Sequence, residues 1–234
     1  MIKTIFFDLD GTLNLMDQDT FTKEYVRSFL SYAAPFGYKP RKLLKALWRS
    51  TGAMIKNDGR NTNCEAFWAA IPRYLGKKVL MQKEEFNSYY ETDFGKLHAV
   101  CPDNPRAPEL IKKLKSAGYR LVIASNPVFP ASAHKTRLRW TGLDPDDFDY
   151  ISDYENSHYC KPSPNYFTEI TDKLSLDPSE CLMVGNNVRE DMAASRVGMD
   201  TFLITYKVIN EKNEDITKFK RGDYDALTDF LGVK

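Results

Sequence analysis

Two carboxylates near the N-terminus are the residues whose types and spacing most directly indicate chemistry. Asp8 and Asp10 follow the apolar run 5–7, and Gly11 and Thr12 come directly after them. Such a run predicts a buried strand, and residues two apart in a strand lie on the same side. Carboxylates held this close against a hydrophobic strand repel each other unless a cation or a shared proton is present. The pair therefore indicates a binding or catalytic site rather than a solvated strand end.

Further polar residues follow later apolar runs or stand in a loop ahead of a helix. They are Ser125, Asn126, Lys161, Asn186 and Asp191. Because the carboxyl ends of parallel strands meet at one edge of a sheet, we expect these side chains to share a crevice with the two carboxylates. Together they offer a carboxylate nucleophile, a second carboxyl group, a hydroxyl, a lysine and oxygen ligands for Mg²⁺. This set suits phosphoryl transfer.

The elements that must position these groups alternate between strand and helix. Helical patterns separate the runs that we predict to be strands, which are residues 2–9, 121–124, 148–151, 181–184 and 201–204. Such alternation implies βαβ units with right-handed crossovers, and hence a parallel sheet. The sequence therefore predicts an α/β fold with a Rossmann-like core.

A long helical segment separates the first strand from the others. We predict that residues 15–98 form a helical domain inserted after the carboxylates, and that residues 1–14 plus 99–234 form the core. The stretch 39–60 within the insertion is basic. It is either a solvated helix face or a surface that steers anionic substrates, and we favour the solvated face.

The composition limits the classes of partner. Lys and Arg number 33 against 32 Asp and Glu, so no positive field favours nucleic acid or an anionic membrane. The four cysteines form no CxxC pair, so neither a zinc site nor a disulfide framework is expected. The N-terminus leads directly into the first strand, and no apolar run approaches the roughly 18 residues of a membrane span. We therefore expect a cytoplasmic protein.

Four groups of residues resemble, in order, the sequence motifs of the haloacid dehalogenase superfamily. They are Asp8-Leu9-Asp10-Gly11-Thr12, Ser125-Asn126, Lys161-Pro162 and the segment from Gly185 to Asp191. The insertion is similar to the helical C1 cap of that family. The resemblance implies a Mg²⁺-dependent phosphomonoester hydrolase that acts on a small phosphorylated metabolite through an aspartyl phosphate.

The same resemblance implies a role for each matched residue. Asp8 would be the nucleophile, and Asp10 would protonate the leaving oxygen and then accept a proton from water. Ser125 and the Asn126 backbone N–H would hold a phosphoryl oxygen, and Lys161 would balance negative charge. The metal would be bound by Asp8, Asp10 (through its backbone carbonyl), Asn186 and Asp191. The chemistry asks for no imidazole, so we expect His134 and His158 to be surface or loop residues.

One residue departs from the family pattern. The fourth motif usually opens Gly-Asp, whereas this chain has Gly185-Asn186. An amide oxygen is still a Mg²⁺ ligand, but the site has one negative charge fewer, so we expect weaker metal binding.

Other activities stay open at this stage. A sugar phosphomutase would have the same four motifs, and a catalytically idle domain that binds a ligand or a protein is the alternative that Asn186 raises. Dehalogenation is disfavoured because halide leaves without a proton, which makes a carboxylate at position 10 unnecessary. The sequence identifies neither the substrate nor the oligomeric state.

Overall fold

The core of the protein is a parallel sheet whose central strands are buried. The computed structural model describes residues 1–233. The strands are β1 (Thr4–Phe7), β2 (Arg120–Ile123), β3 (Tyr150–Ile151), β4 (Cys181–Gly185), β5 (Asp200–Ile204) and β6 (Lys220–Gly222). They are parallel and lie in the order β3-β2-β1-β4-β5-β6. The predicted Rossmann-like α/β fold is confirmed.

The register of the sheet brings the ends of its central strands level. Phe7, the last residue of β1, pairs with Ile123 of β2 and with Val184 of β4. The residues that follow these three strands therefore emerge side by side at the carboxyl edge. The first strand is shorter than predicted, because the chain leaves the sheet at Asp8 and turns at Gly11.

Helices cover both faces of the sheet. These helices are α6 (Arg106–Ser116), α7 (Ala131–Trp140), η4 (Pro145–Asp147), α8 (Pro164–Leu174), η5 (Pro178–Glu180), η6 (Met192–Val197) and α9 (Tyr224–Leu231). Side chains of α6 and α9 pack with Ile5 and Phe7 on one face, and those of α8 and η6 pack with Phe6 on the other. The alternation of β1 residues between two apolar layers explains why its run is continuously hydrophobic.

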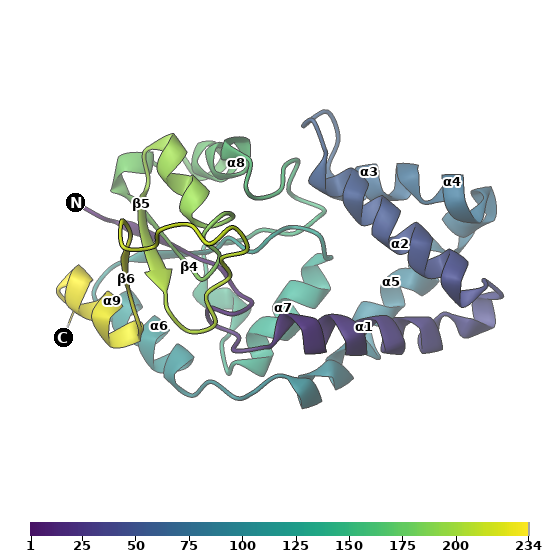
Figure 1. The fold of residues 1–234 in the computed structure, drawn as a ribbon, viewed down its shortest axis with the longest axis horizontal. Coiled ribbons are helices and arrows are strands. Elements are labelled where there is room, and N and C mark those ends of the chain that lie inside the picture. Colours follow the sequence, from purple (N-terminus) through teal and green to yellow (C-terminus); the bar gives the residue numbers. More distant parts are fainter. Residues whose placement is uncertain (234) are drawn as a thin grey trace.

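The chain between β1 and α6 is helical and lies to one side of the sheet (Figure 1). It comprises α1 (Gln18–Tyr32), η1 (Ala34–Phe36), α2 (Pro40–Ile55), α3 (Asn63–Ala70), α4 (Pro72–Leu75), η2 (Lys77–Gln82), α5 (Lys83–Glu91) and η3 (Phe94–Val100). We call this segment, α1 to η3, the helical insertion. Its apolar side chains form a second core, largely aromatic, which extends to Ala133 and Trp140 of α7.

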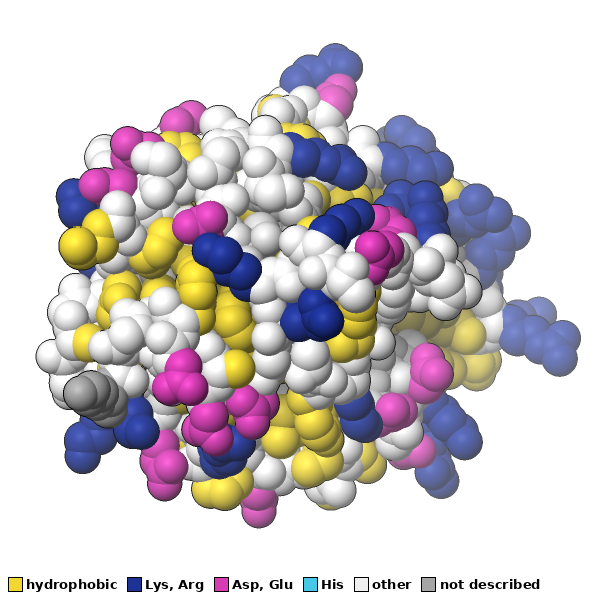
Figure 2. All heavy atoms as spheres, turned by 60° about the vertical axis from the view of Figure 1, so that its left-hand side comes forward, with side chains coloured by type: hydrophobic (Ala, Val, Ile, Leu, Met, Phe, Trp, Pro, Cys, Tyr) yellow, Lys and Arg dark blue, Asp and Glu magenta, His cyan; other side chains and the backbone are white. Residues whose placement is uncertain are grey.

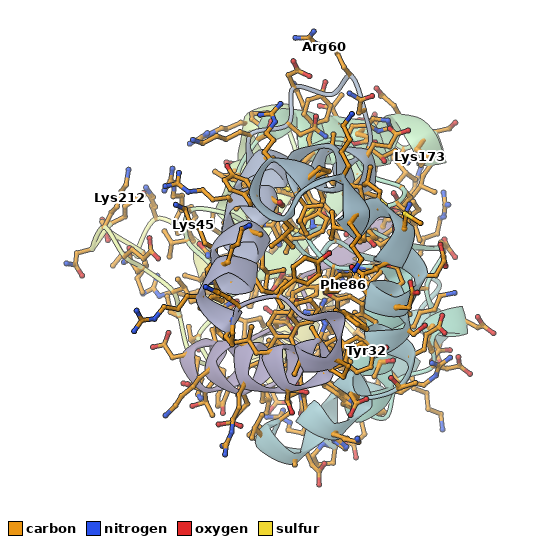
Figure 3. The ribbon with its side chains drawn as sticks, turned by 90° about the vertical axis from the view of Figure 1, so that its right-hand side faces the viewer. Tyr32, Lys45, Arg60, Phe86, Lys173 and Lys212 are labelled. Atoms are coloured by element: carbon orange, nitrogen blue, oxygen red, sulfur yellow. The ribbon has the colours of Figure 1, made fainter. Side chains whose placement is uncertain are left out.

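Charged side chains of both signs are interspersed over the core, and blue Lys and Arg side chains gather over the more distant insertion (Figure 2). Along α2, Leu43 and Leu47 are buried, whereas Lys42 and Lys45 are exposed. Lys45 and Arg60 lie at the outside of the insertion, and Phe86 lies within its ring of helices (Figure 3). This arrangement favours the solvated-face interpretation of residues 39–60. Within residues 1–233, no helix combines the length and apolar character required of a membrane span.

A buried asparagine joins the insertion to the core. Asn63, at the start of α3, is fully buried. Its side-chain amide donates to the backbone carbonyls of Pro127 (3.2 Å) and Tyr159 (3.4 Å), and its backbone N–H donates to the carbonyl of Ser157 (2.8 Å). These carbonyls belong to core loops that follow β2 and β3, so one side chain fixes the insertion above the edge of the sheet.

We expect Asn63→Ala to loosen this junction. The substitution leaves buried carbonyl groups without their donor, which costs about 1–3 kcal/mol. Urea unfolding should show this decrease in the free energy of unfolding, and the rate of amide hydrogen exchange should rise in residues 57–64. The matched control is Asn61→Ala, because Asn61 is exposed and its side chain can be removed with little effect on stability. Equal stability of the two variants would contradict the role given to Asn63.

Candidate active site

A buried lysine lies between two carboxylates at the carboxyl edge of the sheet. The Lys161 ammonium donates to Asp8 Oδ1 at 2.7 Å and to Asp191 Oδ1 at 2.6 Å, and its side chain is 1% exposed. Burial alone would lower the pKa of Lys161, but Asp191 and Asp8 raise it well above its ordinary value. The lysine is therefore charged, and it neutralises part of the negative charge around Asp8.

The contacts of Asp191 show how Lys161 is held. One Asp191 oxygen accepts from Lys161, and the other accepts from the backbone N–H of Asn187 at 2.8 Å. A Cβ atom at Gly185 would lie 2.2 Å from Asp191 Oδ2, so only glycine fits at the end of β4. Both Asp191 oxygens thus have protein partners, and its geometry is that of a residue that positions the lysine.

Two oxygen atoms face the hydroxyl of Thr12. Asp8 Oδ2 and Asn186 Oδ1 each lie 3.5 Å from Thr12 Oγ1. The Asn186 amide nitrogen donates to the backbone carbonyl of Lys207 at 2.8 Å, and this bond fixes the amide with its oxygen facing Thr12. Gly11 has a φ of 86°, and a Cβ there would lie 2.2 Å from Asn186 Nδ2. The turn after the carboxylates therefore requires glycine for both conformation and space.

Asp10 is held by a residue that the sequence did not single out. Arg137 of α7, with a side chain 1% exposed, donates from Nη1 to Asp10 Oδ2. Burial raises the pKa of Asp10 to about 6, although the Arg137 guanidinium opposes the rise. Asp10 is thus set to change protonation near neutral pH.

The Arg137 guanidinium has a second buried partner. Its Nη2 lies 3.0 Å from Nδ1 of His134, one turn earlier on the same helix. Burial and the charge of Arg137 lower the pKa of His134 well below its usual value, so the imidazole is neutral and accepts through Nδ1. The expectation that His134 is a surface or loop residue is wrong, since it is fully buried. His158 does lie in a loop, beside Glu169.

A signal for this pair was present in the sequence. His134 and Arg137 stand three residues apart, among Ala133 and Leu138, and all four lie on the buried face of α7. Two polar residues on one apolar helix stripe indicate a buried polar interaction. The partner, Asp10, lies 127 positions away, and only the fold reveals it.

A cavity of about 340 Å³ joins the predicted site residues. It is lined at one end by Asp8, Asp10, Ser125, Asn126, Asn186 and Asp191, and at the other by the helical insertion. Lys161 reaches this end of the cavity through Asp8. The Ser125 carbonyl accepts from Ser152 Oγ (2.7 Å) and from Tyr166 Oη (2.8 Å), which fixes the loop after β2.

The site offers oxygen ligands for a metal ion, although few of them are carboxylates. Across residues 1–233, no group of three or more His, Cys, Asp or Glu side chains is arranged to hold a metal. The Asp10 and Asp191 carboxylates already contact Arg137 and Lys161. Asp8 Oδ2 and Asn186 Oδ1 remain, and Thr12 Oγ1 lies 3.5 Å from each of them. Oxygen atoms are the donors that Mg²⁺ prefers, so this set fits the ion.

Comparison with known proteins places this geometry in context. A family model described as haloacid dehalogenase-like hydrolase matches residues 2–198. Glyceraldehyde 3-phosphate phosphatase of Pyrococcus abyssi is 26% identical over 248 residues, covering 100% of this chain and 94% of the relative. Pyrophosphatase PpaX of Halalkalibacterium halodurans is 22% identical, covering 100% and 98%.

One solved structure illustrates the likeness in fold. The crystal structure of a HAD phosphatase from Thermococcus onnurineus superposes with a TM-score of 0.60 at 20% identity, covering 100% of this chain and 99% of that one. At this identity the likeness concerns the fold alone.

The contact between Asp10 and Arg137 can be tested by titrating the Asp10 carboxyl group. Arg137→Met removes the cation that holds down the pKa of Asp10, so that pKa should rise above its value of about 6. Carbon-13 NMR of the Asp10 carboxyl group in metal-free protein measures it directly.

The control for this titration is Arg139→Met, which removes an exposed arginine from the same helix. It should leave the Asp10 titration in place. An unchanged Asp10 pKa in Arg137→Met would show that the two side chains do not interact in solution.

Proposed function

The chain belongs to the haloacid dehalogenase-like hydrolase family, and from this we propose that it is a phosphatase that hydrolyses phosphomonoesters through an aspartyl phosphate on Asp8. The observation that carries the proposal is the buried contact of Lys161 with Asp8 and Asp191, beside Asp10, in one cavity. A carboxylate attacks an anionic phosphate only where positive charge offsets their repulsion. Lys161 supplies such a charge within hydrogen-bond distance of the nucleophile.

The proposed reaction has two steps. An Asp8 oxygen bonds to phosphorus, the ester P–O bond breaks, and Asp10 gives its proton to the departing oxygen. Water then attacks the phosphorus of the aspartyl phosphate while Asp10 takes up a proton, which releases inorganic phosphate and restores Asp8. Ser125 Oγ and the Asn126 N–H bind a phosphoryl oxygen in both steps.

The environment of Asp10 suits an acid that must also act as a base. A group works best in both roles when its pKa lies near the working pH. Burial alone would keep Asp10 protonated, whereas the Arg137 cation favours the ionised form. Arg137 therefore acts as a positioning residue that makes both protonation states of Asp10 accessible.

We include Mg²⁺ in the proposal, because the donor set fits it and because the charges at the site do not balance. Among residues 1–233, the cations in contact with Asp8, Asp10 and Asp191 are Lys161 and Arg137. When bound, Mg²⁺ supplies charge stabilisation of the phosphoryl oxygens. Asp8, Asn186 and the Asp10 backbone carbonyl would hold it. Ligation by Asp191 stays a prediction that its two protein contacts do not favour.

The helical insertion is the proposed cap. It forms the wall of the cavity opposite the strand ends, so it would exclude water from the aspartyl phosphate and contact the leaving group. The named relatives act on small phosphorylated compounds, which supports a substrate of the same general kind. No charge balance or motif in the chain favours nucleic acid as a substrate.

Asp8→Asn should abolish the reaction. The amide keeps the shape of the side chain but is not a nucleophile, so release of phosphate from p-nitrophenyl phosphate with Mg²⁺ should fall by at least about 10³-fold. Asp200→Asn, which changes an exposed carboxyl group at the start of β5, is the control and should keep full activity. Persistent activity of Asp8→Asn would exclude Asp8 as the nucleophile.

Asn186→Asp should tighten Mg²⁺ binding, as measured by calorimetry. The carboxylate adds a negative charge beside Asp8, and this gain exceeds the roughly 1 kcal/mol hydrogen bond to Lys207 that the amide gives up. The control is Asn187→Asp, because Asn187 Oδ1 accepts backbone bonds from Arg189 and Glu190 that a carboxylate also accepts. Equal Mg²⁺ affinity in Asn186→Asp and the unmodified protein would place position 186 beyond reach of the ion.

A further inference from the structure

The end of the cavity beyond the proposed phosphate site is walled by aromatic rings. Among its lining residues are Phe21 and Tyr25 of α1, Phe67 and Trp68 of α3, and Phe86 and Tyr90 of α5. Figure 3 shows Phe86 inside the ring of helices that forms this wall. Apolar and aromatic walls of this kind bind ring-bearing or aliphatic groups.

The tyrosine hydroxyl groups of the cavity are paired with other side chains. Tyr25 Oη and Tyr90 Oη lie 2.9 Å apart, and Tyr154 Oη donates to Asn87 Oδ1 at 3.3 Å. Within residues 1–233 the Trp68 Nε1–H has no partner, so a ligand meets these rings with a free indole donor among them. Gln18, Thr22, Thr51 and Asn87 also line the cavity, but aromatic and aliphatic side chains outnumber them.

Positive charge is scarce in the same place. Of the cavity-lining residues in the described part of the chain, Arg137 alone is basic, and its guanidinium is engaged by Asp10 and His134. Glu190 and Glu211 also line the cavity. These two glutamates belong to the core loops after β4 and β5, so a carboxylate or a second phosphate at the aromatic end would lose its hydration without gaining a cation as a partner, which is unfavourable.

The basic residues of α2 do not change this balance. Lys42 and Lys45 are both exposed, and neither lines the cavity. Lys45 lies at the outside of the insertion, away from Phe86 (Figure 3). The charged residues that line the cavity therefore belong to the core, and the side chains that the insertion contributes are uncharged and mostly apolar.

We propose, on the basis of the phosphatase function above, that the alcohol released by this enzyme is uncharged and apolar and carries an aromatic or alicyclic ring. The phosphate of the substrate lies at Asp8 and Lys161, and its organic part lies among the rings of α1, α3 and α5. This assignment sets the chain apart from phosphatases whose leaving group is anionic. It also disfavours a sugar phosphomutase, which must bind a phosphate at each end of the sugar.

A series of phosphomonoesters tests the proposal. Hydrolysis of ethyl, butyl and hexyl phosphate releases alcohols of similar acidity. Differences in kcat/KM among these esters therefore report the apolar contacts of the alkyl chain. Burying one methylene group corresponds to about a three- to fourfold gain, so butyl phosphate should exceed ethyl phosphate about tenfold. 2-Phenylethyl phosphate should exceed 2-phosphoglycolate and pyrophosphate by at least about 10²-fold. Equal rates along the series, or a preference for either anionic compound, would overturn the proposal.

A binding measurement separates this proposal from the proposed function. Calorimetry with 2-phenylethylphosphonate and with phosphonoacetate needs no turnover. If none of the esters is hydrolysed but the phenylethyl compound binds more tightly by at least about tenfold, the phosphatase function fails and the apolar assignment stands. If none is hydrolysed and the phenylethyl compound binds no more tightly than phosphonoacetate, both fail.

Substitution in the wall provides a matched pair of variants. Phe67 lines the cavity and is only partly buried, so Phe67→Ala should fold and should lower kcat/KM for 2-phenylethyl phosphate about tenfold, with ethyl phosphate little changed. Phe36 is a partly buried aromatic residue of the same insertion core that does not line the cavity. Phe36→Ala should leave the ratio of the two substrates unchanged. A parallel loss with both substrates in Phe67→Ala would indicate a structural effect and contradict the proposal.

Discussion

The ion pairs of Lys161 with Asp8 and Asp191 are the interaction on which the site depends. A buried ammonium is tolerated only when carboxylates compensate it, and removing one partner of such a group costs about 3–5 kcal/mol. The second oxygen of Asp191 accepts a hydrogen bond from the Asn187 N–H, and the lack of a side chain at Gly185 leaves room for the Asp191 carboxylate. Asp8, the proposed nucleophile, Lys161 and Asp191 thus come from three separate segments, which the parallel sheet brings together.

The distribution of charge along the cavity accounts for both proposals. At the strand ends, three carboxyl groups contact two cations, which is consistent with the proposed divalent ion, and burial raises the pKa of Asp10. At the far end, the walls are rings whose hydroxyl groups are paired with other side chains. A substrate with one anionic end and one apolar end matches this division.

Much of the fold and the site could be predicted, because both follow from local patterns and one topological rule. Apolar runs in the sequence predicted β1, β2, β4 and β5. Because parallel strands place their carboxyl ends at one edge, this prediction already brought Asp8 close to Ser125 and Asn186. The three-residue strand β6 has a polar, mostly exposed sequence and carries no such pattern. The contact of Arg137 with Asp10 joins residues distant in the chain. In the sequence, the aromatic residues of the wall show only the spacing typical of helices. That spacing does not distinguish rings that border a cavity from rings that are packed in the core.

The central claim is that the Asp8 carboxylate receives the phosphoryl group beside Lys161. A crystal structure of the protein with Mg²⁺ and beryllium fluoride tests it most directly, because trifluoroberyllate bonds to a carboxylate oxygen and imitates an aspartyl phosphate. We expect the adduct on Asp8, with Lys161 and Ser125 in contact with its fluorine atoms. An adduct on another residue, or an Asp8 side chain turned away from the bound fluoride, would contradict the account.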